Sequence, residues 1–295
     1  MNYQIIQADC TDAVNRINTP VDLTFLDPPF NQDKDYLQHN DNLPADAYWS
    51  WMQQICQSIL ETTSDGGAIY FMQREKNTEH VLRCLRETGW TFQNLIIWKK
   101  KTSAVPGTFR FGKHHQVIAF ATKGSKPRLF NRLRIDPPLL ATEKNPRPTG
   151  MYVTDVWDDI RELTSGYYAG DEPLRDTQGE RQHKQQSPIA LLLRIILSST
   201  RTGDTVLDPF AGTGTTLVVA EQLSRCSIGI ENAPENAALI TERLEQLRAA
   251  DSIDKYYDDY RHTENLSEIW GQAHRGSGKN DVFNLPLFRS FTEET

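Results

Sequence analysis

An apolar run that ends in an acid and two prolines constrains this chain more than any other feature. Residues 21–26 (VDLTFL) have the composition of a buried strand in a parallel sheet. The next residues are Asp27, Pro28, Pro29 and Phe30. Because proline lacks an N–H and pushes the preceding residue out of the helical region, these residues predict a stiff turn at the carboxyl end of the strand. Ligands of open α/β sheets bind at that edge.

The turn has the groups that an exocyclic amino group on a planar base would require. The Asp27 carboxylate and the Pro28 carbonyl oxygen are two acceptors directed at one point, and Phe30 offers a flat ring beside them. The alternative interpretation is a strand that ends in a Pro-Pro turn with a helix-capping acid. Since a four-residue motif recurs by chance, the first interpretation requires a second site in the chain.

The rest of the chain alternates between strand and helix patterns, which predicts a parallel sheet wrapped by helices. We expect one Rossmann-like α/β sheet, mostly parallel with an antiparallel edge strand at residues 117–121 and with helices on both faces. An irregular region is inserted between its two halves. In the predicted helix 47–62, a stripe of apolar residues at helical spacing is expected to be core. Its members are Tyr48, Trp51, Met52, Ile55 and Ile59.

A glycine-rich turn later in the chain supplies the second site. Residues 205–207 are a short predicted strand, the turn contains Gly212 and Gly214, and Glu231 follows about 20 residues further on. A phosphate-binding P-loop would need a lysine before Thr215, and none is present. A dinucleotide site usually has a third glycine, which is also missing. An S-adenosylmethionine site needs only a close backbone and an acid, so it fits best.

Charge is distributed very unevenly along the chain. The formal net charge is −7, but residues 99–148 contain 12 Lys and Arg against 2 Asp and Glu, a local charge of 12 minus 2, or +10. Such a segment can neutralise phosphates even in an acidic protein. The alternative is a solvated basic loop. Four scattered cysteines favour buried thiols over disulfides or a metal site. Without an apolar span or signal-peptide pattern, we expect a cytoplasmic, nucleoid-associated protein.

Together the two motifs resemble those of amino-group DNA methyltransferases with the permuted, beta-type order. The Asp-Pro-Pro-Phe motif comes first, the recognition segment lies in the middle, and the Phe-Ala-Gly-Thr-Gly motif comes last. The resemblance runs from about Asp9 to Leu247. It implies a catalytic half (1–122), a target-recognition region (123–186), a cofactor-binding half (187–249) and a C-terminal extension (250–295).

The resemblance also implies roles for individual residues. Asp27, Pro28, Pro29 and Phe30 match the catalytic motif, with Phe30 in place of the more common tyrosine. The residues expected to hold S-adenosylmethionine are Asp9, Cys10, Ser187, Asp208, Phe210, Ala211, Gly212, Thr213, Gly214, Thr215, Glu231 and Asn232. The residues expected to contact DNA are Lys99, Lys101, Arg110, Lys113, His115, Lys123, Arg128, Arg132 and Arg134.

One position departs from the family pattern. Gln186, Ser187 and Pro188 stand where a Lys-Pro motif usually closes the cofactor pocket, so a lysine side chain has no role there. From the residues themselves, Ser187 is expected to cap the apolar helix 189–200, with Pro188 at the first helical position.

The expected function is transfer of the methyl group of S-adenosylmethionine to the exocyclic amino group of a flipped base in duplex DNA. The acid at position 27 favours adenine N6, because cytosine-N4 enzymes more often have serine there. Cytosine N4 is the alternative; a non-catalytic nucleic-acid-binding module and an RNA methyltransferase are further ones. No metal is expected, and a homodimer is left open.

The C-terminal extension contains one further motif. Residues Asn284–Phe288 (NLPLF) resemble the short peptides that bacterial proteins dock on the replication sliding clamp, with Asn284 in place of the usual glutamine. The favoured alternative is a tail that packs on its own domain.

Overall fold

The computed structural model describes residues 2–32, 35–36, 39–40, 42–102, 105–137, 147–163, 170–175, 178–181 and 186–271, without the side chains of 35–36 and 39–40. Residues Asn284–Phe288 lie outside these ranges, so the sliding-clamp hypothesis has no structural account. None of the described helices is long and apolar enough to cross a membrane.

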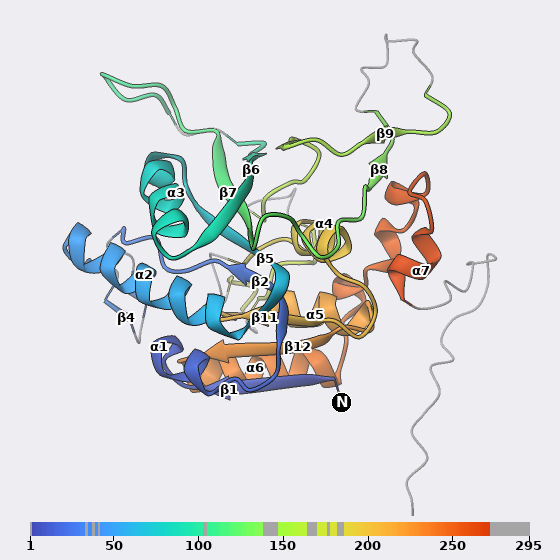
Figure 1. The fold of residues 1–295 in the computed structure, drawn as a ribbon. Coiled ribbons are helices and arrows are strands. Elements are labelled where there is room, and N and C mark those ends of the chain that lie inside the picture. The colour runs from blue at the N-terminus through green and yellow to red at the C-terminus, as the bar shows by residue number, and fades with distance from the viewer. Residues whose placement is uncertain are drawn as a thin grey trace, which may run out of the picture.

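Within the described residues, eight strands form one sheet in the order β1-β12-β11-β2-β5-β7-β6-β10 (Figure 1). The strands of this sheet are β1 (Tyr3–Gln7), β2 (Val21–Leu26), β5 (Thr63–Arg74), β6 (Trp90–Lys99), β7 (His115–Lys123), β10 (Val156–Trp157), β11 (Thr205–Asp208) and β12 (Cys226–Glu231). Two small hairpins pair β3 (Asp35–Tyr36) with β4 (His39–Asn40) and β8 (Arg134–Ile135) with β9 (Met151–Tyr152).

The strands from β1 to β5 in this order are all parallel, and β7 is antiparallel to both of its neighbours. This confirms the predicted mostly parallel sheet with an antiparallel edge. The antiparallel strand is not itself outermost, because β6 and then β10 add outside it. Since β10 belongs to the predicted recognition region, part of that region extends the main sheet.

The helices cover both faces of the sheet (Figure 1). They are α1 (Cys10–Ala13), α2 (Ala45–Thr62), α3 (Thr78–Glu87), α4 (Ile189–Ser199), α5 (Thr215–Gln222), α6 (Pro234–Glu245) and α7 (Leu266–Trp270). Short 3-10 helices lie at Val14–Arg16, Glu75–Asn77, Ala249–Asp251, Asp254–Tyr256 and Asp258–Tyr260.

Alternate residues of the central strands divide between two cores. In β5, Tyr70 and Met72 pack into the core beneath α4 and α5, whereas Ile69 and Phe71 pack into the core beneath α1, α2 and α3. This alternation follows from the two-residue period of a strand. A central strand buried on both faces must therefore be apolar throughout, which explains the continuous apolar runs in the sequence.

Candidate active site

A cavity of about 570 Å³ opens at the carboxyl ends of the parallel strands. Its walls come from the residues that directly follow β1, β2, β11 and β12, including Asp9, Asp27, Phe210 and Asn232. The Asp-Pro-Pro-Phe turn follows β2 and the glycine-rich turn follows β11, and these two strands are neighbours. Two motifs about 180 residues apart in sequence are therefore brought into one cavity by the strand order.

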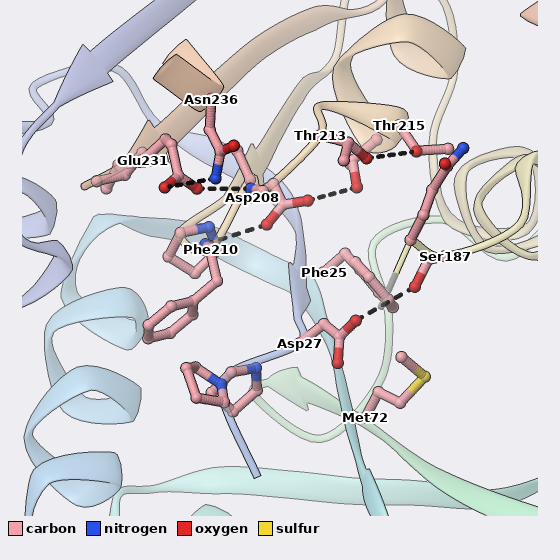
Figure 2. A pocket seen from close by; sticks show the side chains of 18 of the residues that line it. Phe25, Asp27, Met72, Ser187, Asp208, Phe210, Thr213, Thr215, Glu231 and Asn236 are labelled. Carbon is pink, nitrogen blue, oxygen red and sulfur yellow. Dashed lines mark hydrogen bonds between the residues drawn. The ribbon is translucent and has the colours of Figure 1, made fainter. Parts of the chain in front are cut away.

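Hydrogen bonds hold the Asp-Pro-Pro-Phe turn rigidly at the end of β2. The Ser187 hydroxyl donates to Oδ2 of Asp27 at 3.2 Å, across a sequence separation of 160 residues (Figure 2). The Tyr48 hydroxyl donates to the Pro29 carbonyl at 2.8 Å, and Gln73 donates to the same hydroxyl at 3.0 Å. Because Pro29 is fixed in this way, the neighbouring Pro28 carbonyl keeps a defined direction.

The contact with Asp27 corrects the predicted role of Ser187. Helix α4 begins at Ile189 with Pro188 as its N-cap residue, so Ser187 does not cap it. The Ile189 N–H instead donates to Oε1 of Glu172 at 2.6 Å. The serine hydroxyl is thereby free to reach the catalytic turn, and a distant glutamate satisfies the helix terminus.

Glycine is needed at both positions of the second motif, but for different steric reasons. Both have left-handed backbones, with φ of 51° at Gly212 and 76° at Gly214. A Cβ at Gly214 would lie 2.7 Å from Ile240 of α6, so its absence allows the two helices to pack. A Cβ at Gly212 would meet only the Phe210 carbonyl, at 3.8 Å, and Gly212 lines the cavity. Gly212 therefore allows a ligand to approach the backbone.

Glu231, at the end of β12, fixes the glycine-rich turn. Its Oε2 accepts from the Gly212 N–H at 2.8 Å, and its Oε1 accepts from the Ala233 N–H at 2.9 Å. The Asn236 amide also donates to Oε1, at 3.3 Å (Figure 2). Burial raises the pKa of Glu231, while hydrogen bonds from Ala233, Asn236 and Gly212 oppose that rise. The carboxylate is thus held at the cavity wall by backbone N–H groups.

Burial raises the pKa of two further groups that line the cavity. Burial raises the pKa of Asp208 to about 7, against hydrogen bonds from the Thr216 hydroxyl and the Phe210 N–H, and nearby Glu231 adds to the rise. Burial likewise raises the pKa of the Cys10 thiol far above its usual range, with Asp9 and Asp208 adding to the effect. Cys10 is therefore a poor nucleophile.

The charges of the cavity suit a cationic cofactor. The described lining contains six carboxylates, at Asp9, Asp27, Glu162, Asp208, Glu231 and Glu235, against the single lysine Lys100. Phosphate groups would be repelled by such a lining, whereas a positively charged sulfonium would be attracted. The residues present therefore fit S-adenosylmethionine and not a dinucleotide. Among the described residues, no group of three or more His, Cys, Asp or Glu side chains could hold a metal ion.

Nearly all of the predicted catalytic and cofactor residues line this cavity. Asp27, Pro28, Pro29 and Phe30 do so, as do all of the predicted cofactor residues except Gly214. Phe30 is only 8% exposed, because its ring also packs into the core beneath α4. Phe30 and Gly212, on which the two-motif interpretation depends, share the cavity.

The predicted DNA-contacting residues divide between opposite edges of the sheet. Lys99 and His115 are paired at the carboxyl ends of the parallel strands, at the base of the arm 100–114 that joins β6 to β7. This arm, the projection at the upper left of Figure 1, contains Lys101, Arg110 and Lys113. Lys123 lies at the other end of β7, about 27 Å away at the usual rise per residue.

The residues at the far edge are tied into the fold. The Lys123 ammonium donates to the Thr63 carbonyl at 2.7 Å. Arg128 donates to both carboxylate oxygens of Asp204, at 2.9 and 2.7 Å, and lies 3.3 Å from Asp22. Because Asp22 and Asp204 precede the cavity by a whole strand length, Lys123 and Arg128 do not lie beside the site. Their charged groups bind acceptors in or beside β2, β5 and β11.

Arg132 and Arg134 belong to a third place, the β8–β9 hairpin. Both guanidinium groups stack on the ring of Tyr152, at 4.0 and 4.3 Å from its centroid. Arg134 also donates to the Thr149 carbonyl at 2.8 Å. Tyr152 remains 38% exposed, so the hairpin presents an aromatic ring with two cations to solvent.

Sequence reasoning missed several residues of the cavity. Trp51 was assigned to the core with the rest of its stripe, and its four companions are indeed buried. Trp51 is partly buried against the same core and also lines the cavity. It donates to the Thr11 hydroxyl at 3.0 Å and packs edge-on against Phe210. Met72, Trp98, Lys100 and Glu162 also line it. The helical period could not show that Trp51 lines a cavity, because apolar residues recur at the same spacing whether a helix faces a core or a cavity wall.

Comparison with known proteins identifies the family. Residues 21–242 match the DNA methylase family of N6 and N4 methyltransferases. The chain is 30% identical over 260 residues to the type II methyltransferase M.HpaI of Haemophilus parainfluenzae, covering 86% of this chain and 78% of that protein. It is 29% identical over 265 residues to M.HinfI of Haemophilus influenzae, covering 83% and 68% respectively.

Solved structures share the fold. The M1.HpyAVI–SAM complex aligns with a TM-score of 0.55 and 23% identity, covering 83% of this chain and 100% of that one. The PvuII DNA methyltransferase, described as cytosine-N4-specific, aligns with a TM-score of 0.59 and 17% identity, covering 92% and 94%. With a matching family over three quarters of its length and both motifs in one acidic cavity, this chain belongs to the S-adenosylmethionine-dependent N6/N4 DNA methyltransferases.

Proposed function

We propose that this enzyme methylates the N6 amino group of adenine in duplex DNA. The observation that carries the proposal is the Asp27 carboxylate beside the Pro28 carbonyl, in the same cavity as Gly212 and Glu231. An aspartate, rather than a serine, at the first motif position supports adenine over cytosine.

The cofactor half of the cavity has the groups needed to bind S-adenosylmethionine. In this proposal Glu231 accepts hydrogen bonds from the ribose hydroxyls, Asp9 contacts the adenine ring, and the Gly212 backbone lies against the methionine end. All three residues line the cavity, which supports these roles. Trp51 and Phe210 add an aromatic wall. When bound, S-adenosylmethionine supplies an electrophilic methyl group on a positively charged sulfur.

The base half of the cavity prepares the nucleophile. The lone pair of the target amine is delocalised into its ring, which makes the amine a poor nucleophile. Asp27 and the Pro28 carbonyl accept its two hydrogens, and this favours a pyramidal nitrogen with a localised lone pair. Ser187 holds Oδ2 of Asp27 at 3.2 Å and so fixes the rotation of the carboxylate. The proton released by the amine passes to Asp27 or to water.

The target base must leave the duplex to reach Asp27. Phe30, which lines the cavity, offers its ring face to the flipped base. On the outside, the proposed DNA surface comprises Lys101, Arg110 and Lys113 on the arm 100–114, Lys99 and His115 at its base, and Arg132 and Arg134 on the β8–β9 hairpin. The described part of the arm, residues 100–102 and 105–114, contains no acidic residue, and from outside it Glu75 lies 3.6 Å from the Lys113 ammonium and Asp158 lies 4.0 Å from that of Lys99.

The experiment that tests the proposal is analysis of nucleosides from DNA of a host lacking other such methyltransferases. Expression of this enzyme is expected to produce N6-methyladenine, and expression of the Asp27→Asn variant is expected to produce none. N4-methylcytosine without N6-methyladenine would overturn the adenine assignment. Methylated nucleosides confined to RNA would overturn the duplex DNA substrate.

A further inference from the structure

The base half of the cavity contains a lysine to which neither motif assigns a role. Lys100 directly follows β6, and it is the only Lys or Arg in the described lining. The remaining wall of this half is formed by Phe30, Met72, Trp98, Gln116 and Leu163. A lone basic side chain in an otherwise acidic and apolar chamber needs an acceptor when a ligand displaces the water around it.

The fold holds Lys100 firmly in place. Its N–H donates to the His114 carbonyl at 2.8 Å, which closes the base of the arm. The next two residues are fixed by Glu162, whose Oε2 accepts from the Lys101 N–H and whose Oε1 accepts from the Thr102 N–H, both at 2.8 Å. The Lys100 ammonium lies 3.2 Å from the centroid of the Trp98 ring, and that indole donates to the Ile160 carbonyl at 2.9 Å.

The two adjacent lysines contact oxygen acceptors, whereas the Lys100 ammonium contacts the Trp98 ring and, within the described residues, no oxygen acceptor. The Lys99 ammonium lies 4.0 Å from the Asp158 carboxylate, and the Lys101 ammonium donates to the Asp158 carbonyl. Among the residues that the structure describes, Nζ of Lys100 has no hydrogen-bond acceptor. Burial lowers the pKa of Lys100 to about 7, opposed by the Glu162 and Asp27 carboxylates, so desolvation outweighs both acids. The amino group thus lies over the Trp98 ring, in the same cavity as Asp27, and has no hydrogen-bond acceptor among the described residues.

The chemistry of the substrate supplies the missing acceptor. In adenine and in cytosine, the ring nitrogen next to the amino-bearing carbon has an exposed lone pair. When Asp27 and the Pro28 carbonyl bind the amino group, this ring nitrogen occupies the adjoining edge of the same chamber and needs a donor. Left unpaired in a dry site, it would weaken binding of the base.

Two roles for Lys100 are chemically available, and one is better supported. A general base for the methylated amine is not needed, because that protonated amine is a strong acid and gives its proton to any carboxylate or water. A donor to the ring nitrogen is needed. We propose that Lys100 donates a hydrogen bond to the ring nitrogen beside the target amino group, so that it recognises the base edge that Asp27 and Pro28 do not contact. This inference rests on the assignment of Asp27 to the amino group.

The experiment combines an enzyme variant with a substrate variant. Lys100→Met is compared with the wild type on a duplex with the natural target base and on one in which the ring nitrogen is replaced by C–H. The second base is 1-deazaadenine for an adenine target or 3-deazacytosine for a cytosine target. We expect kcat/KM to fall about tenfold on the natural base, the value of one lost hydrogen bond, and to be unchanged by the mutation on the deaza base.

Three controls keep the result specific. Lys99→Met removes the same charge one residue away and is expected to act equally on both substrates. A 7-deazaadenine duplex removes a different ring nitrogen and should preserve the tenfold effect. If Lys100→Met does not fold, as judged by thermal unfolding, the same comparison is made with Lys100→Gln, which retains an N–H donor and should lose less than tenfold on the natural base.

Two outcomes would contradict the proposal. An equal fall on the natural and deaza bases would assign Lys100 a structural role at Trp98. An unchanged kcat/KM of Lys100→Met on the natural base would show that Lys100 does not recognise the base. Failure of the proposed catalytic role of Asp27 is distinguishable, because methylation would then persist in Asp27→Asn whatever the effect of Lys100.

Discussion

The two ends of strand β11 carry buried acids in contrasting surroundings. Asp204, just before the strand, is bound by both guanidinium N–H groups of Arg128. Asp208, the last residue of the strand, meets the Thr216 hydroxyl and the Phe210 N–H, and no described cation pairs with it. The acids are only four residues apart in the sequence, yet one belongs to an ion pair and the other to the wall of a cavity.

The same contrast holds for the basic residues at the two edges of the sheet. At the amino edge, Arg128 and Lys123 are bound to protein acceptors that join β2, β5 and β11. At the carboxyl edge, Lys99 and Lys113 lie 4.0 and 3.6 Å from the carboxylates of Asp158 and Glu75, but Lys100 has no described acceptor and Arg110 has no described ion pair. Compensated charges stabilise the fold, whereas uncompensated charges are available to a ligand. The amino edge is therefore built for stability and the carboxyl edge for binding and chemistry.

The largest effect should come from the carboxyl edge. Asp27→Ala removes the proposed acceptor for the target amino group, and kcat is expected to fall at least about 10³-fold. Binding of S-adenosylmethionine, measured by calorimetry, should change little, because the glycine-rich turn is held by Glu231 rather than by Asp27. Methylation at more than a tenth of the wild-type rate would place the chemistry elsewhere.

Asp208 should make the carboxyl edge sensitive to pH. Its pKa is raised to about 7 in the folded protein, so the folded chain retains a proton that the unfolded chain loses near pH 4. This contribution to stability is therefore complete at low pH and is lost as the pH rises through 7. Between pH 5 and 8 the free energy of unfolding of the wild type should fall by about 3 kcal/mol relative to Asp208→Asn, in urea titrations. Parallel pH profiles for the two proteins would contradict this.

Arg128 should affect stability without affecting DNA contact. Its side chain is 22% exposed and that of Asp204 is 6% exposed. Arg128→Met leaves Asp22 without its cation and leaves Asp204 with only the exposed Arg201, 3.6 Å away. The free energy of unfolding is expected to fall by about 2–3 kcal/mol, at the lower end for a broken buried pair because of the partial exposure. The salt dependence of DNA binding should be unchanged. A shallower slope of log K for DNA binding against log salt concentration would indicate that Arg128 contacts DNA.

Substitution of Arg110 should give the smallest effect. In contrast to Arg128, it should change DNA binding and leave stability unchanged. Arg110→Gln removes a cation from the exposed arm, so the slope of log K for DNA against log salt concentration is expected to become shallower by roughly 0.9. Thermal unfolding should be unchanged, since the described structure gives this guanidinium no ion pair. An unchanged slope together with a lower melting temperature would mean that Arg110 stabilises the fold and does not contact DNA, which would contradict the distinction between the two edges.

The sequence determined the chemistry at the ends of the strands. The Asp27 turn and the Gly212 turn could be located because prolines, glycines and acids have conformational requirements that do not depend on distant parts of the chain. The parallel sheet followed from the alternation of strand and helix patterns. These local requirements also predicted that the two turns would lie on one edge, since parallel strands end on the same side.

Only the tertiary structure decided which basic and aromatic side chains serve the site. The sequence alone does not distinguish Lys99, Lys100 and Lys101. The position of Lys100 at the end of β6 and the contacts of Glu162 with the following residues place only Lys100 in the cavity lining. Arg128 lies in the same basic segment, yet β7 runs antiparallel and carries the chain to the opposite edge. Trp51 belongs to a core stripe but faces Phe210. Such assignments depend on strand direction and on neighbours far away in sequence, which local composition does not encode.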